Sequence, residues 1–223
     1  MQSQASSPNK IKPNTLLRLN SLASLLLALF IICTSVLLVT AQTWAYPKIR
    51  GGIRNQYELN EETIQENYQG LIHYNLSYFS EELNFEGLPM SPEGRQHFVE
   101  VRVIFLAVKT IWLLSALLLI PLSITLIKNK KPHFLRKGGF LSLLLPAILA
   151  LPLLLDFNRA FIVFHKIFFS NDYWIFDPAR DPVILYLPQE LFFNLGLAIL
   201  VVLTLLAFSS IFLAKKLAKK RWQ

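Results

Sequence analysis

Residues 21–45 read SLASLLLALFIICTSVLLVTAQTWA, and this stretch decides the class of the protein. It contains no charged residue, and it exceeds the roughly 20 apolar residues that cross the hydrocarbon core of a membrane. Three further stretches are also predominantly apolar: 103–127, which contains the single charge Lys109, the shorter stretch 139–156, and 191–214. The chain of 223 residues is 53% hydrophobic and only 16% charged, against roughly 25% charged in soluble domains. We therefore expect an all-α polytopic membrane protein with four transmembrane helices.

The first apolar stretch must be compared with a secretory signal peptide, because Lys10, Lys12 and Arg18 precede it. Its apolar part is longer than the about 7–15 residues of a signal peptide, and no small-residue cleavage site follows it. We expect the stretch to be retained as a helix. The single cysteine, Cys33, excludes an internal disulfide framework and a cysteine-based zinc cluster.

The basic residues mark one side of the membrane. Thirteen Lys and Arg residues fall in the segments 1–20, 128–138 and 215–223, and none of the fourteen Asp and Glu residues lies there. The positive-inside rule makes these segments the cytoplasmic N-terminal segment, linker and tail of a cell-membrane protein. The segments 46–102 and 157–190 are then extracytoplasmic. The net charge of +8 thus reports topology, and no nucleic-acid partner is expected.

The extracytoplasmic segments have patterns that predict structure. Apolar residues spaced by three and four after Asn60 indicate an amphipathic helix, which Asn60 would cap. A second helix is expected to begin near Glu93 and to continue into the span 103–127. We expect 46–102 to form a mostly helical cap. In 157–190 we expect an interfacial helix followed by a loop rich in Asp and Pro.

His97 and Glu100 form the first candidate pair for a functional site. They are three residues apart on a helix, so the carboxylate could orient the imidazole. A surface ion pair would explain the same spacing. Val101 stands where a metalloprotease helix has its second histidine, and that motif is therefore excluded.

His165 is the second candidate, because it lies among phenylalanines. Phe161 and Phe168 share its face of a helix, so the imidazole is expected to be desolvated, neutral and able to act as a base. A histidine that only marks the membrane interface is the alternative. His73 and His133 are expected to be solvated. Three aromatic residues are typical of the interfacial belt: Tyr173, Trp174 and Tyr186.

The two histidine segments can be written as motifs. Residues 97–102 read HFVEVR and residues 164–169 read FHKIFF. The second motif is followed by Asp172-Tyr173-Trp174 and by turns at Asp177 and Asp181. Both motifs resemble the signatures of the lipoprotein intramolecular transacylase family, which are small four-span proteins of Gram-positive bacteria. The family's first signature reads roughly His-Met-x-Asp-Val-Lys/Arg, so this chain differs from it at Phe98 and Glu100. Length, span number and motif positions agree over essentially the whole chain.

The resemblance implies an acyl transfer within one substrate. Enzymes of this family move an acyl chain from the glyceryl sn-2 ester of a diacylglyceryl-cysteine lipoprotein to its own N-terminal α-amine, which gives a lyso-form lipoprotein. His97 and His165 match the family's catalytic histidines. The resemblance implies diacylglyceryl lipoproteins and membrane lipid as partners, and no cofactor. No metal is expected, because two histidines without a third suitable ligand at motif spacing make a poor metal site. Six further motif residues are expected to orient groups or to position the substrate: Glu100, Arg102, Asp172, Trp174, Asp177 and Asp181.

The residues suit this chemistry. A free α-amine has a pKa of about 7.7–8.0 and needs a base near neutrality, which His165 could provide. His97, positioned by Glu100, could donate a hydrogen bond to the oxyanion. Amine and ester belong to one molecule, so no covalent enzyme nucleophile is required. The sequence leaves open which histidine is the base, and it leaves open the oligomeric state.

Three other functions compete with the transacylase. A membrane lipase-like hydrolase would use the same histidines to activate water. A non-enzymatic accessory or scaffold protein would not need them. A transporter is least favoured, because Lys109 is the only charge deep within a predicted span and has no named partner.

Overall fold

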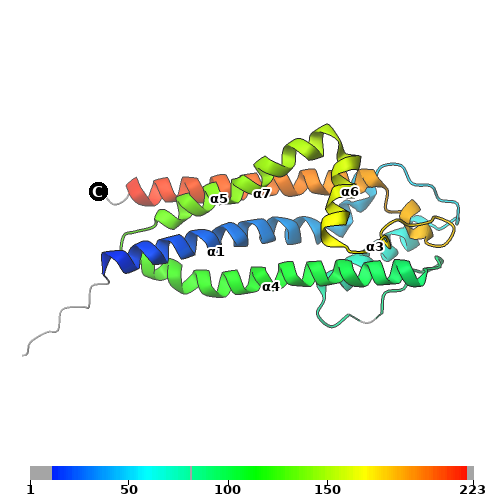
Figure 1. Ribbon diagram of the computed structural model, residues 1–223, viewed down its shortest axis with the longest axis horizontal. Coiled ribbons are helices and arrows are strands. Elements are labelled where there is room, and N and C mark those ends of the chain that lie inside the picture. The colour runs from blue at the N-terminus through cyan, green and yellow to red at the C-terminus, as the bar shows by residue number, and fades with distance from the viewer. Residues whose placement is uncertain (1–11, 81, 220–223) are drawn as a thin grey trace, which may run out of the picture.

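The computed structural model describes residues 12–80 and 82–219, so Lys10, Lys220 and Arg221 of the basic segments lie outside the described residues. Within these described ranges, four helices are long and apolar enough to cross a membrane. They are α1 (Pro13–Thr40), α4 (Pro92–Lys128), α5 (His133–Leu155) and α7 (Gln189–Lys219). The expected all-helical, four-span membrane fold is therefore confirmed. Figure 1 shows the spans as an elongated bundle with the remaining elements gathered at one end.

The apolar stretches mark the membrane rather than the ends of the helices. α1 begins eight residues before the stretch 21–45 and ends at Thr40. The residues that follow form the short helices η1 (Thr43–Ala45) and α2 (Tyr46–Ile49). α5 likewise begins at His133, inside the basic linker. Backbone hydrogen bonding continues into water wherever the residues tolerate it, so hydropathy alone does not give these ends.

α1 is the centre of the bundle, and it packs against α4, α5 and α7. Small residues allow α5 to approach its neighbours closely. A Cβ atom on Gly138 would lie 2.9 Å from the backbone oxygen of Ser24 in α1, and one on Gly139 would lie 2.9 Å from that of Ala207 in α7. Close backbone contact at small residues is the usual means by which helices associate in lipid, where burial of apolar surface drives little.

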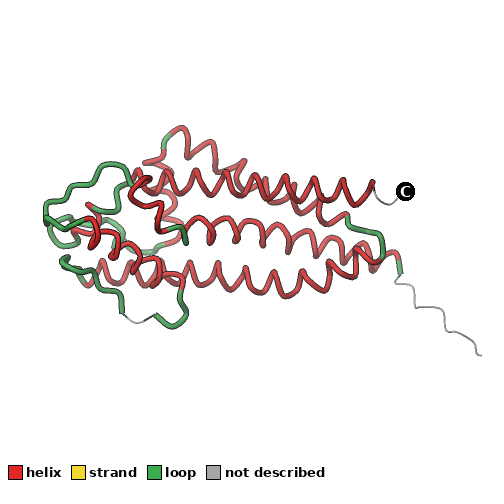
Figure 2. The backbone as a smooth tube through the Cα atoms, turned by 180° about the vertical axis from the view of Figure 1, so that it is seen from behind, coloured by secondary structure: helices red, strands yellow, loops and turns green. Residues whose placement is uncertain are grey.

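α5 carries prolines at positions 146 and 152, and its end nearer the cap bends away from α7 in Figure 1. Proline removes a helical hydrogen bond and is a common cause of such bends. α5 ends at Leu155, and Asp156 caps the next helix, α6 (Phe157–Phe168), by accepting a hydrogen bond from the Arg159 N–H at 2.9 Å. α6 runs across the bundle, as the view from behind in Figure 2 also shows.

The cap contains α3 (Glu61–Leu76) and the short helix η2 (Pro182–Leu185), together with η1 and α2. The Asn60 side chain accepts a hydrogen bond from the Thr63 N–H, so the expected helix cap is confirmed. α4 begins at Pro92 and continues through the membrane without a break, as expected. His73 and His133 are exposed, which also agrees with expectation.

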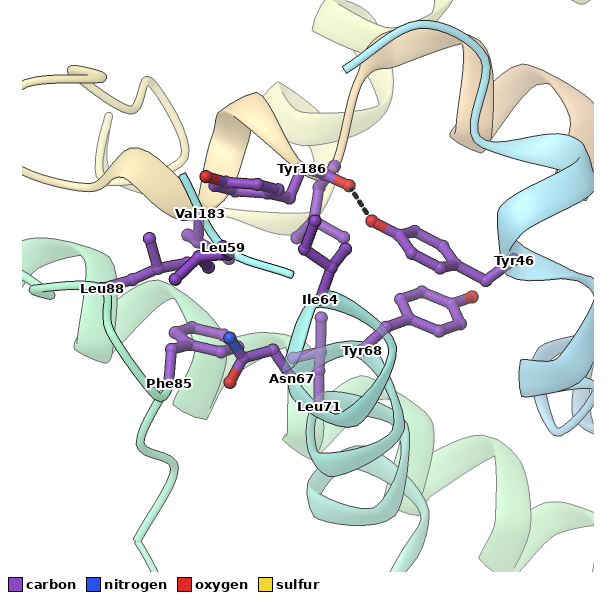
Figure 3. A pocket seen from close by; sticks show the side chains of 11 residues that line it. Tyr46, Leu59, Ile64, Asn67, Tyr68, Leu71, Phe85, Leu88, Val183 and Tyr186 are labelled. Carbon is purple, nitrogen blue, oxygen red and sulfur yellow. Dashed lines mark hydrogen bonds between the residues drawn. The ribbon is translucent and has the colours of Figure 1, made fainter. Parts of the chain in front are cut away.

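A small pocket lies within the apolar core of the cap (Figure 3). At its edge the Tyr46 hydroxyl donates a hydrogen bond to the backbone oxygen of Tyr186 at 2.6 Å. Tyr186 is 4% exposed, and its own hydroxyl donates to the Asn55 side chain at 2.8 Å. The expectation that Tyr186 belongs to an interfacial belt is therefore wrong. Its polar atoms find partners inside the cap, and composition alone does not reveal such partners.

Candidate active site

The first turns of α4 stand outside the membrane. α4 has 37 residues and is therefore about 55 Å long, whereas the hydrocarbon core is about 30 Å thick. His97 lies in this projecting part, and α6 brings His165 to it. The two imidazole ring centres are 5.9 Å apart. The side chains are 6% and 8% exposed, so the structure joins the two histidines that the sequence singled out and removes both from solvent.

Aromatic rings surround the histidine pair. Phe169 and Phe176 pack against the ring of His97, at 4.8 and 5.5 Å between ring centres. Trp174 lies over the ring of His165 at 4.7 Å, with 31° between the planes. Trp174 was expected in the interfacial belt and, from the motif, as an orienting or substrate-positioning residue; in the structure it packs against His165. Its indole N–H is buried and has no hydrogen-bond partner among the described residues.

The tautomer of His165 follows from its partner. Nδ1 lies 2.7 Å from the backbone oxygen of Phe161, one turn earlier in α6. A carbonyl oxygen only accepts hydrogen bonds, so Nδ1 carries the proton and Nε2 holds the lone pair. Burial lowers the pKa of His165 below its usual value. His165 is thus a buried, neutral imidazole, as expected, with its lone pair on Nε2.

His97 has a different environment. Its Nδ1 is buried and has no hydrogen-bond partner among the described residues. Burial, and then the neighbouring His165, lower the pKa of His97 to about 4. His97 therefore stays neutral throughout the physiological pH range. A neutral imidazole of such low basicity accepts a proton poorly, but its ring N–H still donates a hydrogen bond.

Glu100 does not contact His97 by a hydrogen bond, contrary to the expected pair. Its Oε1 accepts from the Asn171 side chain at 2.9 Å and from Gln96 at 3.2 Å. Asn171 follows α6, so this bond links the segment that carries His165 to the helix that carries His97. Sequence reasoning missed Asn171, because the partner lies 71 positions away and no spacing rule connects the two residues.

The other motif residues have separate surroundings. Arg102 donates to the backbone oxygen of Ser77 at 3.1 Å, and its guanidinium lies over the ring of Tyr74. Asp172 and Asp177 are exposed. Asp177 accepts from the Ala179 N–H at 2.9 Å within its own turn.

Asp181 is buried and fastens the loop to the start of α4. Its carboxylate accepts from the Ser91 N–H and from the Ser91 hydroxyl, both at 2.7 Å. The Ser91 hydroxyl oxygen in turn accepts from the Gly94 N–H and caps α4. Any Cβ on Gly94 would overlap the Asp181 carboxylate. Asp181 therefore holds the loop 177–182 against the start of α4. Among the described residues no group of His, Cys, Asp and Glu could hold a metal ion.

The chain was compared with known proteins. The model of the family described as "Lipoprotein intramolecular transacylase Lit" matches residues 21–193. The chain belongs to this family. The match contains both histidines, and it confirms the family that the motifs at 97–102 and 164–169 indicated.

Solved structures of Lit from Bacillus cereus share this fold. One is 30% identical in sequence with a TM-score of 0.88, and the alignment covers 94% of this chain and 99% of that one. Another, which carries a histidine-to-arginine substitution, is 30% identical with a TM-score of 0.80, covering 93% and 94%. These relatives are membrane-integral and come from a Gram-positive bacterium, as expected for the family. A comparison with curated proteins found no significant match to the chain.

The buried neutral histidines make the stability of this Lit family member depend on pH. An unfolded histidine has a pKa of about 6.5, whereas His97 in the fold has a pKa of about 4. The unfolded chain binds more protons between these values, so the stabilisation is complete above about pH 6.5 and is lost as the pH falls towards 4. The loss for His97 is roughly 3 kcal/mol. We expect the midpoint of thermal unfolding to fall over this range, and to fall less for His97→Asn. Equal decreases in both proteins would contradict this account.

Proposed function

We propose that the protein transfers the sn-2 acyl chain of a diacylglyceryl lipoprotein to the α-amine of the same lipoprotein. The observation that carries the proposal is a pair of buried neutral histidines, 5.9 Å apart, at one end of a membrane bundle. A membrane-anchored substrate presents its ester and its N-terminus close to the membrane surface. The charge distribution supports an extracytoplasmic site with both termini in the cytoplasm.

The two histidines have separate roles in this reaction. His165 Nε2 removes the proton from the attacking amine, while Nδ1 donates to Phe161 and keeps the tautomer fixed. A ring N–H of His97 donates to the oxyanion of the tetrahedral intermediate. Starting from the neutral amine, the new C–N amide bond forms, the C–O ester bond breaks, and His165 returns its proton to the glyceryl oxygen that leaves. Bond making and proton transfer therefore balance without a covalent acyl-enzyme.

The fold can hold the amine close to the ester and can exclude water from the reacting groups. Holding the amine and ester of one substrate in a reactive geometry accounts for about 7–11 kcal/mol of the barrier. The rings of Phe169, Phe176 and Trp174 exclude water around the imidazoles. This environment favours the amine over water as nucleophile, and so favours transfer over hydrolysis.

Glu100 and Asn171 position the two histidine segments relative to each other. Asn171→Asp would place two carboxylates at the 2.9 Å contact, and we expect the rate of transfer to fall by about tenfold or more. Adding Glu100→Gln restores a hydrogen bond, because the glutamine amide donates to the new carboxylate. The double variant should therefore be faster than Asn171→Asp alone, which a double-mutant cycle measures. The exposed neighbour Ser170 provides the control Ser170→Ala, which should match the wild type. A double variant no faster than the single one would exclude this positioning role.

The proposed function is tested with purified protein and two synthetic diacylglyceryl lipopeptides in one mixture. One peptide carries both a heavy peptide label and heavy acyl chains, and the other carries neither. An intramolecular transfer gives amide products in which peptide and acyl labels stay together. Crossed products would show an intermolecular transferase instead, and free fatty acid with an unmodified amine would show a hydrolase.

A further inference from the structure

The segment that follows α3 lies beside a membrane span. The Tyr78 hydroxyl and the Thr110 hydroxyl of α4 are 3.0 Å apart. Lys109 donates to the backbone oxygen of Leu76, and its ammonium lies 4.7 Å from the centre of the Tyr78 ring. The residues around the end of α3 are therefore at the level of Lys109 and Thr110 along α4.

The length of α4 places this level in the bilayer. Thr110 is 18 residues before Lys128, the last residue of α4, which corresponds to about 27 Å. The hydrocarbon core is about 30 Å thick. With the charged Lys128 at the far interface, Thr110 lies at the boundary between hydrocarbon and headgroups on the cap side. The loop 77–80 is thus located at the membrane surface and does not stand clear of it.

Lys109 can lie at this boundary because its charge has a partner. The carbonyl end of a helix carries a partial negative charge that stabilises a cation, and Lys109 bonds to the last residue of α3. Arg102 does the same one residue further on, at the oxygen of Ser77. These two contacts explain the only charge deep within a predicted span, and they hold the end of α3 down against α4.

Phe79 projects from this loop. It is 94% exposed, more than any other large hydrophobic side chain among the described residues. The next most exposed ones, Leu155 and Ile167, lie at the end of a span and on α6. In Figure 1 the loop that follows α3 lies below α4, at about the same position along the bundle as α6, which lies above α4 in this view.

We infer that the loop 77–80 is a membrane anchor of the cap, whose Phe79 side chain inserts among the lipid acyl chains of the cap-side leaflet. Tyr78 lies at the headgroup level, where aromatic residues with a polar end are favoured. The cap then contacts the bilayer at two places, through α6 and through the loop 77–80. Lipid contacts the Phe79 side chain, because this exposed side chain lies at the depth along α4 where the protein is surrounded by the bilayer.

The inference is tested by a nitroxide label on Phe79→Cys in the full-length protein in liposomes. The native Cys33 is buried, so labelled wild type measures the background. Two matched variants calibrate the depth: Leu117→Cys, exposed on the membrane part of α4, and Gln69→Cys, exposed on α3. Because Phe79 is almost fully exposed, its replacement leaves the packing unchanged.

The label at position 79 should be accessible to oxygen and shielded from a water-soluble nickel chelate, as at position 117. The label at position 69 should show the reverse. Nickel access at position 79 equal to that at position 69 would place the loop in water and overturn the inference. Shielding from both oxygen and nickel would mean that protein, a second copy or another chain, covers Phe79, and this would overturn it as well.

Discussion

Replacing His165 with alanine is expected to lower the rate of acyl transfer by about 100- to 10,000-fold, the range for a lost general base. His165 is the imidazole whose tautomer is fixed by Phe161, and its free Nε2 is the one basic atom assigned to the reaction. As the C–N bond forms, the nitrogen of the neutral amine becomes cationic and must lose one proton, and Nε2 is the atom that accepts it. The rate is measured with purified protein and a diacylglyceryl lipopeptide by following the amide product.

Two comparisons make the His165 result specific. His73→Ala removes an exposed histidine of α3 and should leave the rate unchanged. His165→Gln keeps a polar side chain of similar length but cannot accept the proton, and should be as slow as His165→Ala. A fast His165→Gln enzyme would mean that His165 is not the base.

Replacing His97 with alanine is expected to lower the rate by about 100- to 1,000-fold, the usual effect of removing one oxyanion donor. The low pKa of His97, about 4, keeps this imidazole neutral, so it is suited to donate a hydrogen bond rather than to take a proton. His97→Gln retains an N–H donor and should therefore be faster than His97→Ala. The two variants are compared in the same lipopeptide assay, with thermal unfolding as the control for folding.

The glutamine variants together separate the two roles. Glutamine should rescue part of the activity at position 97 and none at position 165. The reverse pattern would mean that His97 is the base and that His165 donates the hydrogen bond to the oxyanion. Equal loss for glutamine and alanine at both positions would contradict the donor role of His97.

The sequence predicts the parts of this fold that depend on local rules. Apolar length identifies the four spans, Asn60 caps α3 because its side chain accepts from a nearby N–H, and α4 starts at Pro92, one residue before the expected start near Glu93. The burial of His165 also follows from sequence, because phenylalanines one turn away share its face. Each of these features involves residues within one or two helical turns of one another.

The features that sequence reasoning missed depend on contacts between distant segments. Glu100 was expected to bond to His97 three residues away, but it bonds to Asn171 from the loop after α6. Tyr186 was expected at the interface, but it is buried against Tyr46 in the cap. Several partners of equal chemistry were available in the sequence, and only the packing of α6 and the cap selects among them.

The central claim is tested most directly in cells. A host that lacks other N-acylating enzymes is compared with and without this protein, and the N-terminal peptide of one lipoprotein is analysed by mass spectrometry. The account predicts a peptide of unchanged mass in which one acyl chain has moved from the glyceryl ester to the α-amine, and predicts that His165→Ala abolishes this change. Loss of one acyl mass with the amine still free would contradict the account and show a hydrolase.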